Sequence, residues 1–398
     1  SCWRNFFQHE VSPLMIHFIP GSQLWQLITL LSFVGEYPHR SRQLLGNKNA
    51  YKILINSLTR PQTICNPQTG ATMTCRLLSV SGKWPNKTVR LYKGALPILE
   101  WIEPGMMDYY LRSFRNHRFS GDQSHVERNH RIAEVTAMCM RSGIEVRPFM
   151  LPELQNEAFL HIIPSEAVMY LSRDLKRLSE DEMSKTSFTR LVGALFASGT
   201  GYSVYNTRDA TMKWSGKGEF KARDSLKDLS NMNSKISAIN SAILFGQSET
   251  VALNTITESD KSRKQEFRFD AIYRNIYFIP LSEDGMRQLR FLTVPNWNEK
   301  ILDLLFEPED RSYNRGLFEY DAVVDGEYVY SYLDGDIARL IRLHQTLDVD
   351  PKEVVVLCFP YQIAFLREYL GQRVEIRVID MDTVEEELGP ERRNLFER

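Results

Sequence analysis

Residues 22–58 read SQLWQLITLLSFVGEYPHRSRQLLGNKNAYKILINSL and decide the fold of the first part of the chain. The pattern predicts three short helices, at Ser22–Phe33, Arg40–Leu45 and Lys48–Leu58. In the first, Ser22 is a good N-cap, and apolar side chains follow it at the i, i+3, i+4, i+7 spacing of a packed helix. Helices this short and this closely spaced favour a small helical module.

The third helix is predicted to have one apolar and one polar face. Asn47 precedes it as a cap, and the residues expected to face inward are Ala50, Ile53, Leu54 and Leu58. The outer face then consists of Lys48, Asn49, Lys52 and Asn56. Lysine suits the phosphates of DNA, and asparagine suits phosphates or the edge of adenine. A helical bundle with ordinary solvated lysines is the alternative explanation of the same residues.

Two β-rich runs follow, at Thr74–Ser79 and Thr88–Tyr92, and they flank the polar tip Gly82–Lys87. A helix that fits the major groove, followed by a basic hairpin, is typical of a winged helix-turn-helix. We therefore predict a winged-helix DNA-binding domain at residues 1–104. The residues expected to contact double-stranded DNA are Arg40, Arg42, Lys48, Asn49, Lys52, Asn56, Lys83, Trp84, Lys87 and Arg90.

The charge of the chain is unevenly distributed. The 398 residues carry a net charge of −1, but residues 1–118 hold 14 Lys and Arg against 5 Asp and Glu, whereas the remainder holds 35 against 45. A basic first part joined to an acidic body indicates that only the first part meets a polyanion. The length suits two or three domains, and we expect a helical connector at 105–187 and a mixed α/β domain at 188–398.

The last third of the sequence alternates between strands and helices. Glu353–Phe359, Gln362–Leu370 and Val374–Met381 have the order and lengths of a βαβ unit, which predicts a partly parallel sheet. A hairpin is expected around Asp325-Gly326, a strong turn dipeptide. The fold class is therefore α/β, or α+β overall. Earlier in this domain, Thr250–Asn254 is expected to be a β-like or buried segment.

Three carboxylates of this domain are weak catalytic candidates. Asp321 lies on the first strand of the expected hairpin, and Asp334 and Asp336 follow the second, as in the acidic part of a Mg²⁺-dependent nuclease. The lysine that usually follows the second acid is missing. In the alternative interpretation, Asp334 caps a helix beginning at Gly335 and Asp336 favours the helix dipole. We expect DNA binding without cleavage, with no cofactor and no metal; Mg²⁺ enters only under the nuclease alternative.

Several protein classes are disfavoured by the composition. The five cysteines are too far apart for a CxxC zinc pattern, and their odd number argues against a disulfide framework. No run of 18 apolar residues predicts a transmembrane helix, and the aromatic, polar start does not resemble a signal peptide. We expect a cytoplasmic protein that does not contact membranes.

The order of parts resembles the replication-relaxation family, winged-helix proteins of Gram-positive plasmids and integrative conjugative elements. The resemblance lies in the winged helix at Leu24–Tyr92, the following helix with His125 and His130, the α/β body, and the phrase SVYNTRDATMKWSGKGEFK at Ser203–Lys221. It brings no catalytic motif with it.

The resemblance implies sequence-specific or structure-specific duplex DNA binding in the replication, transfer or regulation of a mobile genetic element. It also implies a body with a degenerate restriction-endonuclease-like core, and other replication or transfer proteins as partners. Two alternatives stay open: a metal-dependent nicking nuclease or relaxase, and a non-catalytic scaffold that docks replication proteins.

Overall fold

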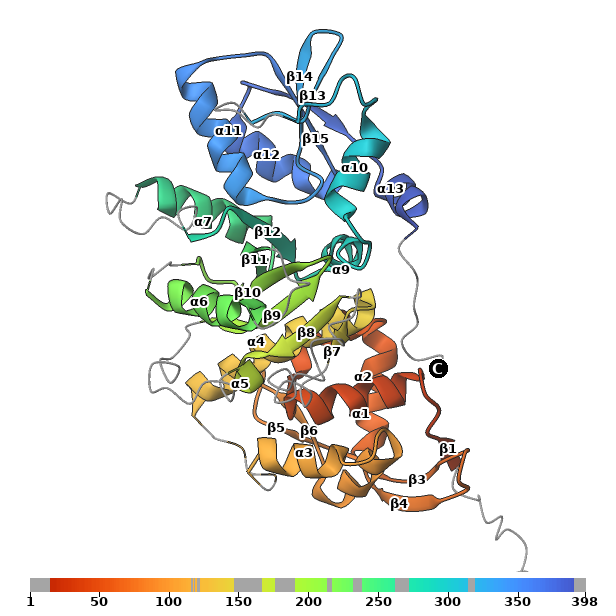
Figure 1. Cartoon of the computed structure of the whole chain (residues 1–398). Helices are drawn as coiled ribbons and strands as arrows, with labels where there is room; N and C mark the ends of the chain where they lie inside the picture. Colours follow the sequence, from red (N-terminus) through yellow and green to blue (C-terminus); the bar gives the residue numbers. More distant parts are fainter. Residues whose placement is uncertain are drawn as a thin grey trace, which may run out of the picture. The chain divides into compact units, whose positions relative to one another are not determined.

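The computed structural model describes residues 15–115, 117, 119, 122–146, 167–175, 190–212, 217–231, 238–261, 272–313 and 319–389. Contacts within the chain divide it into two units, Ser1–Ala133 with Asn394–Arg398, and Glu134–Arg393. We call them unit 1 and unit 2 and describe each by itself (Figure 1). Both contain helices and sheets, so the chain has the mixed α/β character expected from the sequence.

The three helices predicted at the start of unit 1 are confirmed. Helix α1 (Gln23–Val34) begins where the Ser22 hydroxyl accepts a hydrogen bond from the Trp25 N–H, 3.2 Å away. It ends at Gly35, whose φ of +76° favours glycine. The 3₁₀ helix η1 (His39–Leu45) follows, and the Asn47 side chain then caps α2 (Lys48–Leu58).

The described residues of unit 1 form two small sheets. Strand β2 (Glu36–Pro38), between α1 and η1, pairs with β6 (Thr88–Leu91), which also pairs with β5 (Leu78–Ser81). The second sheet joins β1 (Met15–His17), β3 (Pro61–Cys65) and β4 (Thr72–Arg76).

The prediction of one strand at Thr74–Ser79 is wrong, because the chain passes there from one sheet to the other. Leu77 separates β4 from β5, is fully buried, and donates its N–H to the carbonyl oxygen of Leu58. The hairpin expected around Gly82–Lys87 is confirmed, since β5 and β6 pair antiparallel on either side of it.

The expected connector, 105–187, contributes both helices and strands. It holds α3 (Met106–Ser113), α4 (Gln123–Ser142), β7 (Glu145–Val146), β8 (Val168–Leu171) and α5 (Ser172–Leu175). Strand β8 pairs with β9 (Leu191–Ala197), so this part of the connector belongs to a sheet of unit 2. Before α3, the 3₁₀ helix η2 (Lys93–Trp101) follows the hairpin.

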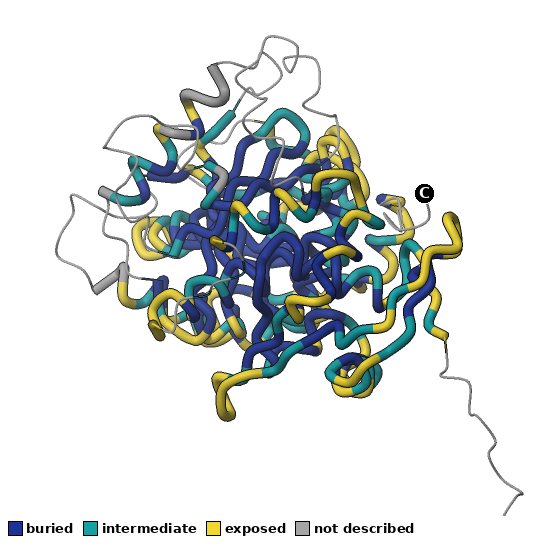
Figure 2. The backbone as a smooth tube through the Cα atoms, turned by 90° about the horizontal axis from the view of Figure 1, so that it is seen from below, coloured by how far each residue is buried: buried dark blue, intermediate teal, exposed yellow. Residues whose placement is uncertain are grey.

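A six-stranded sheet with the order β12-β11-β10-β9-β8-β7 forms the first layer of unit 2. Strand β9 runs antiparallel to both neighbours, whereas β10 (Thr200–Arg208), β11 (Ala238–Gly246) and β12 (Asn275–Pro280) are parallel. Every residue of β9 is buried, as expected for a strand covered on both faces. The buried residues of the chain are coloured dark blue in Figure 2.

A four-stranded sheet with the order β13-β14-β15-β16 forms the other part of unit 2. Its strands are β13 (Ala322–Val324), β14 (Glu327–Ser331), β15 (Val354–Cys358) and β16 (Glu375–Val378). Strands β14, β15 and β16 are parallel, with α11 (Ile337–Val349) and α12 (Ile363–Leu370) as crossovers. The predicted βαβ unit is therefore confirmed, as is the turn at Asp325-Gly326.

The remaining helices of unit 2 include one that the sequence did not indicate. The segment Thr250–Asn254, expected to be β-like or buried, is helical rather than β-like because it lies within α7 (Glu249–Lys261), and its burial is confirmed at Val251 and Ala252. Thr255 and Ile256 continue the buried side of α7 at helical spacing. Other helices among the described residues of unit 2 are α6 (Lys217–Asn231), α9 (Glu283–Phe291), α10 (Trp297–Leu305), the 3₁₀ helix η7 (Pro360–Gln362) and α13 (Met381–Leu388).

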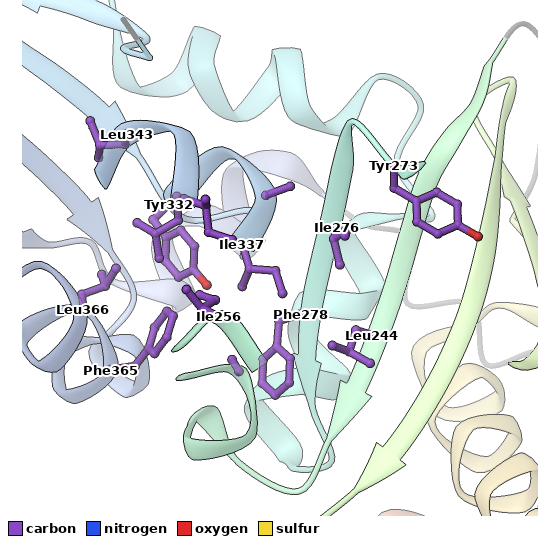
Figure 3. Close-up of a cluster of buried hydrophobic side chains, with 14 of the residues drawn as sticks. Leu244, Ile256, Tyr273, Ile276, Phe278, Tyr332, Ile337, Leu343, Phe365 and Leu366 are labelled. Atoms are coloured by element: carbon purple, nitrogen blue, oxygen red, sulfur yellow. The ribbon is translucent and has the colours of Figure 1, made fainter. Parts of the chain in front are cut away.

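One hydrophobic cluster joins the two sheets of unit 2. Leu244 and Phe278 of the six-stranded sheet lie in the same cluster as Ile337 of α11 and Phe365 of α12 (Figure 3). Because a sheet buries an apolar face only against another element, this shared core fixes the two sheets of unit 2 to each other.

Replacing Gly193 with alanine tests the close packing of β8 on β9. A Cβ at Gly193 would lie 2.2 Å from the Tyr170 carbonyl oxygen and 2.4 Å from the Met169 methyl group. We expect Gly193→Ala to lower the free energy of unfolding by about 1–3 kcal/mol, measured by denaturant unfolding. Gly94→Ala is the control, because its Cβ meets its nearest neighbour at an ordinary 3.6 Å. Equal stability of the two variants would contradict the packing described here.

Candidate functional site

Helix α2 presents a polar face to solvent in unit 1. The four residues predicted on its outer face, Lys48, Asn49, Lys52 and Asn56, are all exposed, as expected. The predicted inner face is wrong in part: Ile53 is 70% exposed, and only Leu58 of the four expected residues is fully buried. The inner face instead consists of Tyr51, Ile55 and Leu58.

The error on α2 arose because Tyr51 was not counted as a core residue. Its ring is buried, and its hydroxyl group donates to the Gln26 side-chain oxygen, 3.1 Å away. Tyr51, Ile55 and Leu58 follow the i, i+4, i+7 spacing, so the sequence contained the signal for the correct face.

The hairpin tip is exposed and basic. Lys83 is exposed, and the Trp84 side chain retains 69% of its accessible surface, so its ring does not pack back onto unit 1. The tip is closed at Gly82, where φ is +80° and an added Cβ would lie 2.8 Å from the Asn86 carbonyl oxygen.

His39 lies where the positive charges of the helix and the hairpin meet. The backbone N–H of His39 donates to the Lys87 carbonyl oxygen at the base of the hairpin, at 2.8 Å. Burial, together with the positive charges of Arg42, Lys87 and Lys52, lowers the pKa of His39 to about 4. Lys52 of α2 and Lys87 of the hairpin are thus close enough to act on one imidazole ring, although they are 35 positions apart in the sequence.

Two of the residues predicted to contact DNA have partners within unit 1 instead. Arg42 is buried and donates to the His39 carbonyl oxygen, 2.9 Å away. Arg90 forms an ion pair with the buried Glu36 at 2.6 Å, so its charge is already neutralised. We correct both assignments, and the candidate interface keeps Lys48, Asn49, Lys52, Asn56, Lys83, Trp84 and Lys87, with the partly exposed Arg40 beside it.

The three acidic candidates lie in unit 2 and have structural partners. Asp336, rather than the expected Asp334, caps the following helix: one of its oxygens accepts hydrogen bonds from the N–H groups of Ala338 and Arg339. The same carboxylate accepts from the Ile276 N–H and the Asn275 side chain on β12. Asp336 therefore ties α11 to the six-stranded sheet.

Asp321 and Asp334 are brought together by the buried guanidinium group of Arg339. An Arg339 nitrogen donates to Asp321 at 2.8 Å, and another lies 3.5 Å from Asp334. Glu319 also contacts Arg339, and the Arg339 guanidinium carbon lies 4.8 Å from the centre of the Tyr330 ring. The positive charge that faces these carboxylates is therefore that of Arg339. The sequence placed this arginine on the next helix but did not indicate where its side chain points.

Asp334 and Arg339 also line a small cavity. It measures about 140 Å³, and its polar lining includes Asn275, Tyr277, Asn298 and Ser331. Burial raises the pKa of Asp334, Arg339 lowers it, and the neighbouring Asp336 and Asp321 raise it, so that the pKa of Asp334 is about 7. A carboxyl group of this kind can gain or lose a proton near neutral pH.

Comparisons with family models, with curated proteins and with solved structures give no match to the chain. In the part of the chain that the structure describes, no three His, Cys, Asp or Glu side chains are grouped so as to hold a metal ion. Among the same residues, no helix has the length and apolar character needed to span a bilayer.

The pH dependence of stability tests the environment of Asp334. Between pH 3.8 and about 7 the folded protein keeps the Asp334 proton that the unfolded chain has released, so this group makes the protein less stable as pH rises. Asparagine has no proton to lose. We therefore expect the stability of Asp334→Asn, relative to wild type, to increase over this interval and to level off above it, in denaturant unfolding at a series of pH values.

Asp325→Asn is the matched control for this measurement. Asp325 is an exposed turn residue with φ of +52°, a conformation that asparagine also tolerates. We expect this variant to follow the wild-type pH dependence. An Asp334→Asn profile parallel to wild type would contradict a raised pKa at Asp334.

Proposed function

We propose that unit 1 is a winged helix-turn-helix that binds duplex DNA. The proposal is supported by the order α1, β2, η1, α2, β3, β4, β5, β6, in which β2 is the third strand of the β5–β6 hairpin sheet and β3 and β4 pair in a separate sheet. The observation that carries it is that the exposed lysines of α2 and the exposed basic hairpin belong to one unit, where the His39 backbone N–H donates to the Lys87 carbonyl oxygen at 2.8 Å. DNA phosphates are the polyanion that such a basic surface attracts.

The surface chemistry favours a division of contacts. Lys48, Lys52, Lys83 and Lys87 would neutralise phosphates, which supplies affinity without sequence preference. Asn49 and Asn56 lie on the same helix and would reach base edges in the major groove. On the resemblance to replication-relaxation proteins, we further propose that the DNA target belongs to a mobile genetic element, in its replication, transfer or regulation.

Binding without cleavage is the form of this function that we favour. The nuclease alternative relies on Asp321, but one of its oxygens accepts from the Ser331 N–H and the other from Arg339, at 2.8 Å each. A metal ion would have to displace that arginine from a buried site. Unit 2 would then serve to dock other replication or transfer proteins, or to regulate the DNA-binding unit.

The double variant Lys48→Ala/Lys52→Ala tests the phosphate contacts. Each lysine that neutralises a phosphate contributes about 0.9 to the slope of log affinity against log salt. We expect the double variant to bind all duplex sequences more weakly and to reduce this slope by about 2, measured by fluorescence anisotropy with the full chain. Lys300→Ala, at an exposed position of α10 in unit 2, is the control and should leave the slope unchanged. An unchanged slope in the double variant would overturn the assignment.

Trp84 provides an optical test of the hairpin. Its exposed ring would become covered when the tip meets DNA, and the emission of an indole group changes when water is excluded from it. We expect duplex DNA to shift or quench the tryptophan emission of the wild-type chain, and we expect Trp84→Phe to lose most of that change. A change of equal size in Trp84→Phe would mean that the hairpin tip stays in solvent when DNA binds.

A further inference from the structure

We propose that α2 reads A·T base pairs, with the Ile53 side chain on the C5-methyl group of thymine and the Asn49 side chain on adenine. This inference rests on the proposed function and names what the same surface recognises. Its starting observation is an isoleucine that remains 70% exposed on a helix whose other exposed residues are polar.

The geometry of α2 places Ile53 and Asn49 at the centre of its outer face. Tyr51, Ile55 and Leu58 define the buried direction of the helix. Successive residues of a helix are rotated by about 100° about its axis. The direction opposite to the mean direction of the three buried side chains therefore falls between Asn49 and Ile53, which are about 40° apart about the axis. Asn56 lies beside Asn49, so these three side chains are the ones that point farthest from the core of unit 1.

The lysines of α2 lie to one side of this centre. Lys52 and Lys48 are rotated from Asn49 by about 60° and about 100° respectively, both in the direction away from Ile53. Lys52 is also the lysine whose charge reaches His39, next to the hairpin. The charged flank therefore faces the hairpin, where DNA backbone contacts are expected, and the uncharged centre is left for the base edges.

The chemistry of the uncharged centre matches one base pair better than the others. The thymine methyl is an apolar group on the major-groove edge, and the adjacent adenine offers N7 and N6 to an asparagine side chain. A neighbouring Asn and Ile, at i and i+4, can meet both halves of an A·T pair or of two successive pairs. A G·C pair offers no methyl group to Ile53.

Removing the methyl group from the DNA tests the contact directly. The probes are a duplex of alternating A·T pairs, the same duplex with uracil in place of every thymine, and a duplex of alternating G·C pairs. Burial of one methyl group corresponds to about a fourfold change in affinity. We expect the full-length protein to bind the thymine duplex about fourfold more tightly than the uracil duplex, and to bind the G·C duplex more weakly than the thymine duplex.

Two serine variants separate Ile53 from general effects of uracil on the duplex. Ile53→Ser should bind the thymine and uracil duplexes equally, because it has no apolar group to lose. Val349→Ser is the matched control: Val349 is 86% exposed at the end of α11 in unit 2, and its loss should leave the thymine preference intact. Both positions are exposed, so both variants should fold, which circular dichroism checks.

The possible results distinguish this inference from the proposed function. Salt-dependent binding with equal affinity for thymine and uracil duplexes would overturn the Ile53 contact and leave DNA binding in place. A thymine preference that persists in Ile53→Ser would also overturn it, because the methyl group would then be read elsewhere. No binding to any of the three duplexes would overturn the proposed function together with this inference.

Discussion

The pairing of β2 with β6 is the constraint on which the candidate interface depends. Strand β2 has only three residues, yet it connects α1 to η1 and holds the hairpin against the helices. At its first position Glu36 is fully buried, with Arg90 of β6 on one carboxylate oxygen and Asn129 of α4 on the other. A buried carboxylate without such partners would be costly, so the ion pair fixes the register of β2 on β6 and, through it, the place of Lys87.

The sequence predicted those parts of the fold that local signals determine. The N-caps Ser22 and Asn47, the stop at Gly35 and the turn at Asp325-Gly326 all act within a few residues, and the structure has each of them where it was expected. Thr74–Ser79 was misjudged because one continuous β-rich run serves two sheets. Nothing local marks Leu77 as the point of exchange, since its burial depends on the distant Leu58.

The acidic residues show why a candidate site is harder to predict than a helix. Asp321, Asp334 and Asp336 were recognised as a group, but their roles depend on partners outside the hairpin: Arg339 in the first turn of α11, and Asn275 and Ile276 on β12. Carboxylates that converge on a buried arginine and carboxylates that converge on a metal ion have the same spacing in sequence. Only the direction of the Arg339 side chain separates the two cases, and that direction is set by tertiary packing.

The two faces of α2 have different surroundings: one is buried in unit 1 and the other is the face that we propose to contact DNA. Its inner face is committed to the core through Tyr51, Ile55 and Leu58, whereas Asn49, Ile53 and Asn56 extend into solvent. Substitutions at exposed positions of this kind usually change stability by less than about 0.5 kcal/mol. If α2 binds DNA as proposed, successive point mutations on this face could alter the preferred DNA sequence while every intermediate protein remains folded, so that new targets would be reachable by gradual evolution.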